Sequence, residues 1–106
     1  MGFFDFLRAP GMDRGVETFR ATEGAVLLDV RTPEEYRTGH VPGSKNLPLQ
    51  AIGGADDLLA HKQVPLFVYC QSGARSRRAA EALRSMGYTN VTNIGGIAAY
   101  TGKVER

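Results

Sequence analysis

Two runs of apolar residues divide the chain and predict buried strands. The first is A-V-L-L-D-V at residues 25–30, in which Asp29 is the single polar position, and the second is L-F-V-Y at residues 66–69. Continuous apolar runs of this length are typical of strands whose two faces are both covered. Two shorter strands are expected at residues 45–47 and 91–94, and a Gly95-Gly96 turn is expected to follow the second of them.

Between these strands, polar and apolar residues recur at helical spacing. The clearest amphipathic helix is predicted at residues 76–86, with Gly87 as its C-terminal stop. Thr32, Pro33 and Glu35 stand as the N-cap, the first-turn proline and the capping acid of another helix. Shorter helical segments are expected at residues 13–21, at residues 49–62 with a cap near Asp56, and at residues 97–100.

Strands and helices alternate along the chain, and this order predicts an α/β fold of three layers. The expected architecture is a central, mostly parallel sheet of four to five short strands with helices on both faces. Residues 12–106 are expected to form this one domain, after an N-terminal extension at residues 1–11. Asp29, Cys70 and Gly95 lie at strand ends, where open parallel sheets bind ligands, so they are expected to converge on one edge.

Composition and charge narrow the classes of function. The 106 residues carry a net charge of +2, which is too small to favour nucleic-acid binding, and no apolar run approaches the length of a membrane span. The single cysteine cannot form an internal disulfide, which favours a reducing, cytoplasmic compartment. His40 and His61 are not spaced like metal ligands, so neither a metal nor a cofactor is expected. Nothing in the pattern requires an oligomer, and a monomer is expected.

The N-terminal segment M-G-F-F-D-F-L-R carries a cluster of aromatic residues interrupted by Asp5. It is too short and too charged for the apolar region of a signal peptide. We expect it to form one amphipathic turn that packs on the domain or, as the alternative, on a partner protein. The apolar residues of this turn are Phe3, Phe4, Phe6 and Leu7.

The stretch at residues 64–76 contains the strongest candidate for chemistry. Cys70 directly follows an apolar strand, and a turn of small residues leads from it into the predicted 76–86 helix. The unpaired N–H groups and partial positive charge of a helix N-terminus favour a thiolate over a thiol. Cys70 is therefore a candidate nucleophile. The alternative is a small buried apolar residue, which is the usual role of an unpaired cysteine.

Arginines are concentrated after this cysteine. Between Cys70 and Arg84 there are four arginines and one acid, Glu81, an excess that would attract a small anion. A solvent-exposed helix face explains most of them equally well, because Arg77 and Glu81 are spaced as an ordinary i,i+4 pair. Arg75, which is expected inside the turn, is the arginine that we assign to the site.

Two histidines could take part in this chemistry. His40 could act as a general base for the cysteine, but we favour a polar loop residue that hydrogen-bonds to neighbouring backbone. His61 is expected to face water at the end of a short helix.

Four motifs occur in a fixed order along the chain, and together they resemble the rhodanese family of sulfurtransferases in its single-domain form. Ordered motifs are more specific than any one of them, and the resemblance spans roughly residues 12 to 104. The motifs are L-L-D-V-R-T-P-E-E-Y at residues 27–36, G-H-V-P-G-S-K-N-L-P-L at 39–49, Y-C-Q-S-G-A-R-S at 69–76 and N-I-G-G-I-A-A-Y at 93–100.

The resemblance implies sulfur transfer without a cofactor. A thiolate at Cys70 would take a sulfane sulfur from an anionic donor such as thiosulfate, form a persulfide, and pass the sulfur to cyanide, a thiol or a protein acceptor. Asp29 and Arg31 match the D-x-R signature of the family and are expected to support the strand end through an ion pair or hydrogen bonds. The loop that would bind the sulfur with inward-pointing N–H groups consists of Gln71, Ser72, Gly73, Ala74, Arg75 and Ser76.

Other functions on similar scaffolds remain open. Phosphatases that resemble this arrangement have five residues between the cysteine and the arginine, whereas four separate Cys70 from Arg75 here. The tighter ring fits one sulfur atom better, so a phosphatase or an arsenate reductase is the weaker alternative. The N-terminal aromatic residues favour a different alternative, which is a persulfide carrier or protein-docking module with little turnover of its own.

Overall fold

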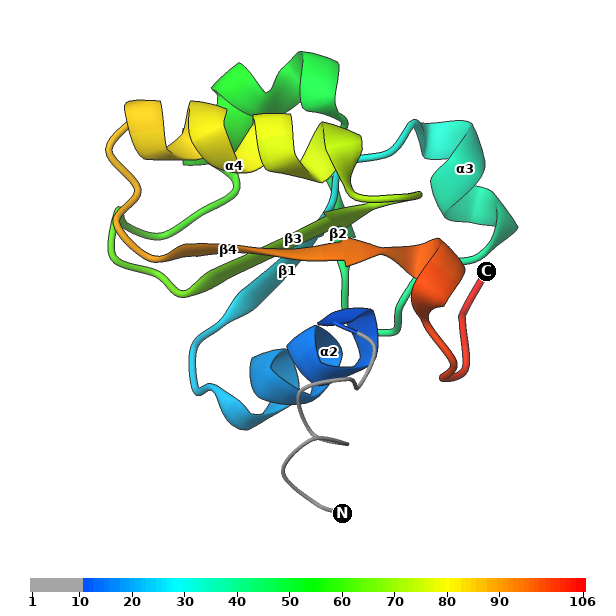
Figure 1. Cartoon of the computed structure of the whole chain (residues 1–106). Coiled ribbons are helices and arrows are strands. Elements are labelled where there is room, and N and C mark those ends of the chain that lie inside the picture. Colours follow the sequence, from blue (N-terminus) through cyan, green and yellow to red (C-terminus); the bar gives the residue numbers. More distant parts are fainter. Residues whose placement is uncertain (1–10) are drawn as a thin grey trace.

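The computed structural model describes residues 11–106, and its centre is a sheet of four parallel strands (Figure 1). Except for Gly11, the predicted N-terminal extension, including its aromatic cluster, lies outside the described residues. The strand order is β2-β1-β3-β4, and all three pairs are parallel, which confirms the predicted parallel sheet. The bounds are Val26–Asp29 for β1, Lys45–Asn46 for β2, Leu66–Cys70 for β3 and Val91–Gly96 for β4.

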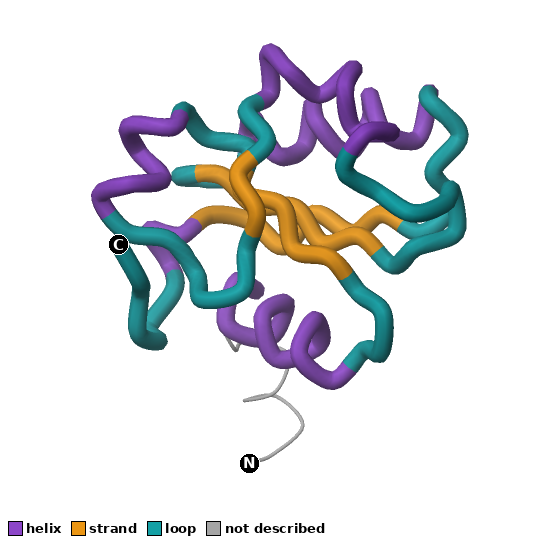
Figure 2. Tube along the Cα trace, turned by 180° about the vertical axis from the view of Figure 1, so that it is seen from behind, coloured by secondary structure: helices purple, strands orange, loops and turns teal. Residues whose placement is uncertain are grey.

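Helical segments cover both faces of this sheet, which confirms the predicted three layers. Figure 1 shows α4 (Ala74–Ser85) above the strands and α2 (Gly11–Ala21) below them, and Figure 2 shows the same layering from behind. Successive residues of β1 point to opposite faces, so that Leu28 joins the core under α4 and Leu27 joins the core over α2. Both are fully buried, which explains the continuous apolar run in the sequence.

The helix predicted around Thr32 has the expected start. In α3 (Pro33–Thr38) the hydroxyl of Thr32 accepts from the Glu35 N–H, and the Glu35 carboxylate accepts from the Thr32 N–H. This reciprocal capping box satisfies two backbone donors that a helix start leaves unpaired. The helix ends at Gly39, also as predicted.

Two other helical segments depart from the expected bounds. α2 begins at Gly11, two residues early, because Met12 is buried in the core and Asp13 accepts from Thr101 instead of capping the helix. Residues 49–62 do not form an α-helix capped near Asp56. A 3₁₀ helix, η1 (Leu49–Asp57), ends there, and the Asp56 carboxylate accepts from Lys62 and Tyr88.

The Gly95-Gly96 turn predicted after the last strand is the end of the strand itself. Gly95 pairs with Tyr69 and Gly96 pairs with Cys70, after a register shift opposite Val68 and Tyr69. The shift lets β4 follow β3 to its last residue, and the helical turn η2 (Ile97–Ala99) begins only beyond it. The carboxyl ends of β1, β3 and β4 therefore meet at one edge, as expected.

Within residues 11–106, no helix combines the length and the apolar character that crossing a lipid bilayer requires. The C-terminal end of the chain lies beside α3 (Figure 1), where Glu105 and His40 form an antiparallel bridge with two N–H···O bonds of 2.8 Å.

Candidate active site

The sulfur of Cys70 lies where β3 ends and α4 is about to begin. Cys70 is the last residue of the strand and is only 1% exposed. The backbone N–H of Gly73 donates to its Sγ atom over 3.0 Å. Gly73 has a φ of +110°, a left-handed conformation that a side chain would strain. The turn therefore curls around the sulfur instead of leaving it open to solvent.

The predicted binding loop is divided between this turn and the helix. Because the Gly73 carbonyl accepts from the Arg77 N–H over 3.1 Å, helical hydrogen bonding begins early, and α4 starts at Ala74. Only residues 71–73 connect the strand to the helix. The expectation that Arg75 lies inside the turn is thus wrong, since Ala74, Arg75 and Ser76 form the first turn of α4.

The Ser76 side chain lies against the Cys70 sulfur and is fully buried. Its Oγ is 3.5 Å from the Sγ of Cys70. Burial alone would raise the pKa of the Cys70 thiol, but the Ser76 hydroxyl and the N–H groups of Ser76, Gly73 and Ser72 hold that pKa below its usual value. Of the amides that were expected to point inward, the Gly73 N–H is the one that donates to the sulfur in the structure, and it favours the thiolate.

The end of β4 packs closely against the turn that follows Cys70. A Cβ atom added to Gly96 would lie 2.2 Å from the carbonyl oxygen of Gln71 and 2.5 Å from the Cα of Ser72. Only glycine leaves room for so close an approach of two backbones. The same carbonyl of Gln71 accepts from the Ala98 N–H over 3.1 Å, which ties the turn to η2.

Arg75 does not point at the sulfur. Its two terminal nitrogens donate to the two carboxylate oxygens of Glu35 on α3, over 2.8 and 3.0 Å. The hydrogen bonds from Arg75 lower the pKa of Glu35 to about 2, with a further contribution from Thr32. Glu35 in turn raises the pKa of Arg75, which also gains from the nearby Cys70 thiolate. Arg75 thus acts on the sulfur through its charge, while its hydrogen bonds join two helices.

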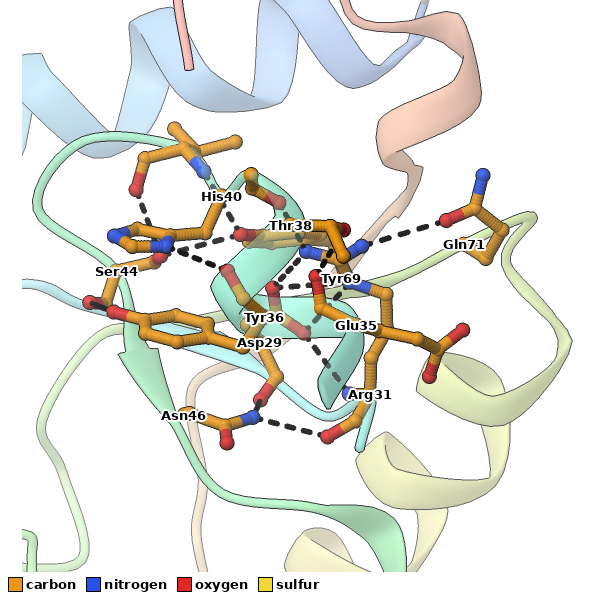
Figure 3. A network of polar contacts seen from close by, with 12 residues as sticks. Asp29, Arg31, Glu35, Tyr36, Thr38, His40, Ser44, Asn46, Tyr69 and Gln71 are labelled. Atoms are coloured by element: carbon orange, nitrogen blue, oxygen red, sulfur yellow. Dashed lines mark hydrogen bonds and ion pairs between the residues drawn. The ribbon is translucent and has the colours of Figure 1, made fainter. Parts of the chain in front are cut away.

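Asp29 and Arg31 form the ion pair expected at the end of β1 (Figure 3). The carboxylate is fully buried, the guanidinium is 3% exposed, and their closest atoms are 2.6 Å apart. Burial would lower the pKa of Arg31, but the paired Asp29 carboxylate keeps it raised. Arg31 also donates to the carbonyl of Gly39 over 2.7 Å and to the side chain of Gln71 over 3.4 Å. The pair thereby contacts the first residue after Cys70.

His40 has the surroundings that we favoured; His61 faces water as expected, but it does not lie at the end of a helix, because η1 ends at Asp57. The His40 ring stacks on Tyr36 with 3.7 Å between ring centroids, and its Nδ1 lies 2.9 Å from the Tyr36 carbonyl oxygen (Figure 3). His61 is exposed, and its Nδ1 accepts from the Gln63 N–H. In the part of the chain that the structure describes, no three His, Cys, Asp or Glu side chains gather in a way that could hold a metal ion.

Asn93 is the residue at this site that sequence reasoning missed. Its Oδ1 accepts from the Ser76 hydroxyl over 2.7 Å and from the Gly95 N–H over 2.9 Å. An asparagine within a short strand carries no signal of its own. Its position beside α4 follows from the register of β4 against β3, which the sequence pattern does not reveal.

Comparison with known proteins points to one family. A family model described as a rhodanese-like domain matches residues 16–103. Protein YqhL of Bacillus subtilis is 38% identical over 91 residues, which span 84% of this chain and 71% of YqhL. Thiosulfate sulfurtransferase PspE of Escherichia coli is 41% identical over 71 residues, 66% of this chain and 68% of PspE. The structure of a rhodanese with anions from E. coli has a TM-score of 0.72 and 35% identity, covering 77% of this chain and 98% of that chain.

Proposed function

The chain belongs to the rhodanese-like domain family, and we propose that it is a sulfurtransferase that moves a sulfane sulfur through a persulfide on Cys70. The observation that carries the proposal is the Gly73 N–H, 3.0 Å from the Cys70 sulfur, at the start of a helix. Donors in this arrangement stabilise a negative charge on sulfur without a neighbouring base. The Cys70 thiolate is the nucleophile, and residues 71–76 bind the transferred sulfur.

The first half-reaction transfers sulfur from the donor to the enzyme. The Cys70 thiolate attacks the outer sulfur of thiosulfate, a new S–S bond forms to Cys70, and the S–S bond of thiosulfate breaks. Sulfite leaves with the electron pair of that bond, and the terminal sulfur of the persulfide carries the negative charge. The N–H groups that lower the pKa of Cys70 would also stabilise this charge, because they belong to the turn and to the first turn of α4 that follow the sulfur.

The second half-reaction returns the enzyme to its thiolate. A nucleophile such as cyanide attacks the terminal sulfur, a C–S bond forms, and the S–S bond to Cys70 breaks with its electrons returning to the Cys70 sulfur. The product is thiocyanate. A thiol acceptor would instead leave as a persulfide. Gln71 and Ser72 are exposed beside the buried sulfur, so we propose that the acceptor approaches over them.

The direction of Arg75 supports sulfur transfer over phosphate or arsenate chemistry. An oxyanion with several charged oxygens needs a guanidinium directed at it. Both terminal nitrogens of Arg75 are occupied by Glu35. The Gly73 amide suits a single charged sulfur atom, whereas the paired terminal nitrogens of Arg75 that would bind a tetrahedral anion are directed at Glu35.

The test is an assay of thiocyanate formation from thiosulfate and cyanide, combined with the mass of the intact protein after thiosulfate alone. The native protein is expected to gain the mass of one sulfur and to turn over, and Cys70→Ser is expected to do neither. Ser85→Ala, at an exposed position of α4, is the matched control and should behave like the native protein. Activity that survives in Cys70→Ser would refute the mechanism, and a sulfur adduct without turnover would favour the persulfide carrier.

A further inference from the structure

Asn93 connects the last strand to the residues around the sulfur. Besides accepting from Ser76 and Gly95 through Oδ1, its Nδ2 donates to the Gly73 carbonyl over 3.4 Å. The Gly95 N–H can only donate, which identifies the oxygen end of the amide side chain. Asn93 is exposed while Ser76 is fully buried, so the amide covers the serine from the solvent side.

Three oxygen acceptors and the Cys70 sulfur surround the single hydroxyl hydrogen of Ser76. The nearest is Oδ1 of Asn93 at 2.7 Å. The carbonyl oxygens of Gly73 and Gly95 follow at 3.1 and 3.3 Å, and the Cys70 sulfur is farthest at 3.5 Å. One hydrogen can serve one good acceptor at a time. Asn93 and a charged sulfur therefore compete for the same hydrogen.

The protonation state of Cys70 decides this competition. While Cys70 is a thiol, its S–H donates to the Ser76 oxygen, and the Ser76 O–H donates to Asn93. Once the sulfur is charged it has no hydrogen to donate and becomes the stronger acceptor. The Ser76 O–H then rotates to the sulfur, and Oδ1 of Asn93 keeps only the Gly95 N–H.

We propose that Asn93 is a positioning residue that holds the hydroxyl hydrogen of Ser76 while Cys70 is a thiol and releases it when the sulfur is charged. The inference rests on the proposed function, because the group that Asn93 controls is the sulfur that would carry out that reaction. By holding the Ser76 hydrogen, Asn93 disfavours the thiolate form of Cys70. Asn93 acts on Cys70 through its hydrogen bond with Ser76.

Charged groups from the neighbouring elements also act on this sulfur. Arg75 on α4 interacts electrostatically with Cys70, and it is paired with Glu35 on α3. The buried Asp29–Arg31 pair lies at the end of β1, and β4 carries no titratable side chain. The pKa of Glu35 is about 2 and that of Arg75 is raised, so neither changes its charge where a cysteine titrates.

The test is the pH dependence of Cys70 alkylation by iodoacetamide, which needs no sulfur donor. Cys70 is the only cysteine, so the reaction reports on this thiol alone. In Asn93→Ala the hydroxyl hydrogen is free for the thiolate, and the midpoint is expected to fall by about 0.5 unit. Thr92→Ala, at the neighbouring exposed position of β4, is the control and should leave the midpoint unchanged.

A double-mutant cycle isolates the route through Ser76. Ser76→Ala alone should raise the midpoint by about 0.5 to 1 unit, and adding Asn93→Ala to it should produce no further change. A midpoint that rises or stays constant in Asn93→Ala would overturn the proposal, because a residue that merely braced the turn would behave in that way. Asn93→Ala alone shows whether the midpoint of alkylation falls or rises, so the test stands even if Ser76→Ala does not fold. Failure of persulfide formation would refute the proposed function, but the pH dependence of Cys70 alkylation could still be measured.

Discussion

Glu35 and Arg75 join α3 to the first turn of α4 through two parallel hydrogen bonds, although 40 residues separate them in the sequence. The Oε1 atom of Glu35, which accepts from one terminal nitrogen of Arg75, also accepts from the Thr32 N–H. One carboxylate thus completes the capping box of its own helix and fixes the helix that follows Cys70.

Glu35→Gln is expected to make stability less dependent on pH in acid. The pKa of Glu35 is lowered from 4.5 to about 2, so its contribution is present above about pH 4.5 and is lost as the pH falls towards 2. Both partners are 33% exposed, and solvent screening limits the contribution to about 1 kcal/mol.

Urea unfolding at neutral pH and near pH 3 measures this dependence. Glu34→Gln is the matched control, because Glu34 is 78% exposed and its carboxylate comes no closer than 3.9 Å to the Arg37 guanidinium. The assignment fails if Glu35→Gln and the native protein lose equal stability between the two pH values.

Asp29→Asn is expected to destabilise the fold strongly. It leaves the Arg31 guanidinium buried opposite a neutral amide, and breaking a buried pair by removing one partner costs about 3 to 5 kcal/mol. Chemical denaturation measures the free energy of unfolding. Asp57→Asn, at an exposed position with the same change of charge, should stay within about 0.5 kcal/mol of the native protein. Equal losses in the two variants would contradict a special role for the buried pair.

Gly96→Ala is expected to displace the turn after Cys70. The added Cβ would meet the Gln71 carbonyl at 2.2 Å, so the backbone of the turn must move. The expected cost is about 1 to 3 kcal/mol of stability, together with a loss of about tenfold or more in sulfur transfer. Gly53→Ala, whose Cβ would meet nothing within 4 Å, should change neither quantity in this way. Full activity in Gly96→Ala would show that the close contact of turn and strand is dispensable.

Cys70 is expected to react as a thiolate at a lower pH in the folded chain than in the unfolded chain. Hydrogen bonds from Ser76 and the turn outweigh the effect of burial and lower its pKa. Alkylation in urea should titrate near the ordinary thiol value of about 8.5, and the native protein should titrate below that value. If the two titrations coincide, the turn does not stabilise the anion.

The secondary structure was predictable wherever a local signal decides it. The capping box at Thr32 and Glu35 and the stop at Gly87 arise from contacts within one helix turn, and the structure contains both. The Gly95-Gly96 pair was misread as a turn because glycine disfavours strands. There the decisive contact is with the distant residues Gln71 and Ser72, which no local pattern encodes.

The site was predictable to the same extent. Cys70 at the strand end and the Asp29–Arg31 pair follow from motif and chain order. The pairing of Arg75 with Glu35 and the position of Asn93 depend on how α3 and β4 are placed beside α4. Those placements are set by strand order and register in the folded sheet, which the spacing of residues does not determine.

The parallel sheet also governs when the site comes into existence during folding. Its side-chain contacts bridge long stretches of chain, 40 residues from Arg31 to Gln71 and 17 from Ser76 to Asn93. Parallel strands have no hairpins to nucleate them, so such contacts form late and only with the whole sheet. Until β4 docks against β3, the turn after Cys70 lacks its close contact with Gly96, so the backbone of the turn is not yet held in place. The sulfur transfer that we propose is therefore expected only from molecules that have completed folding.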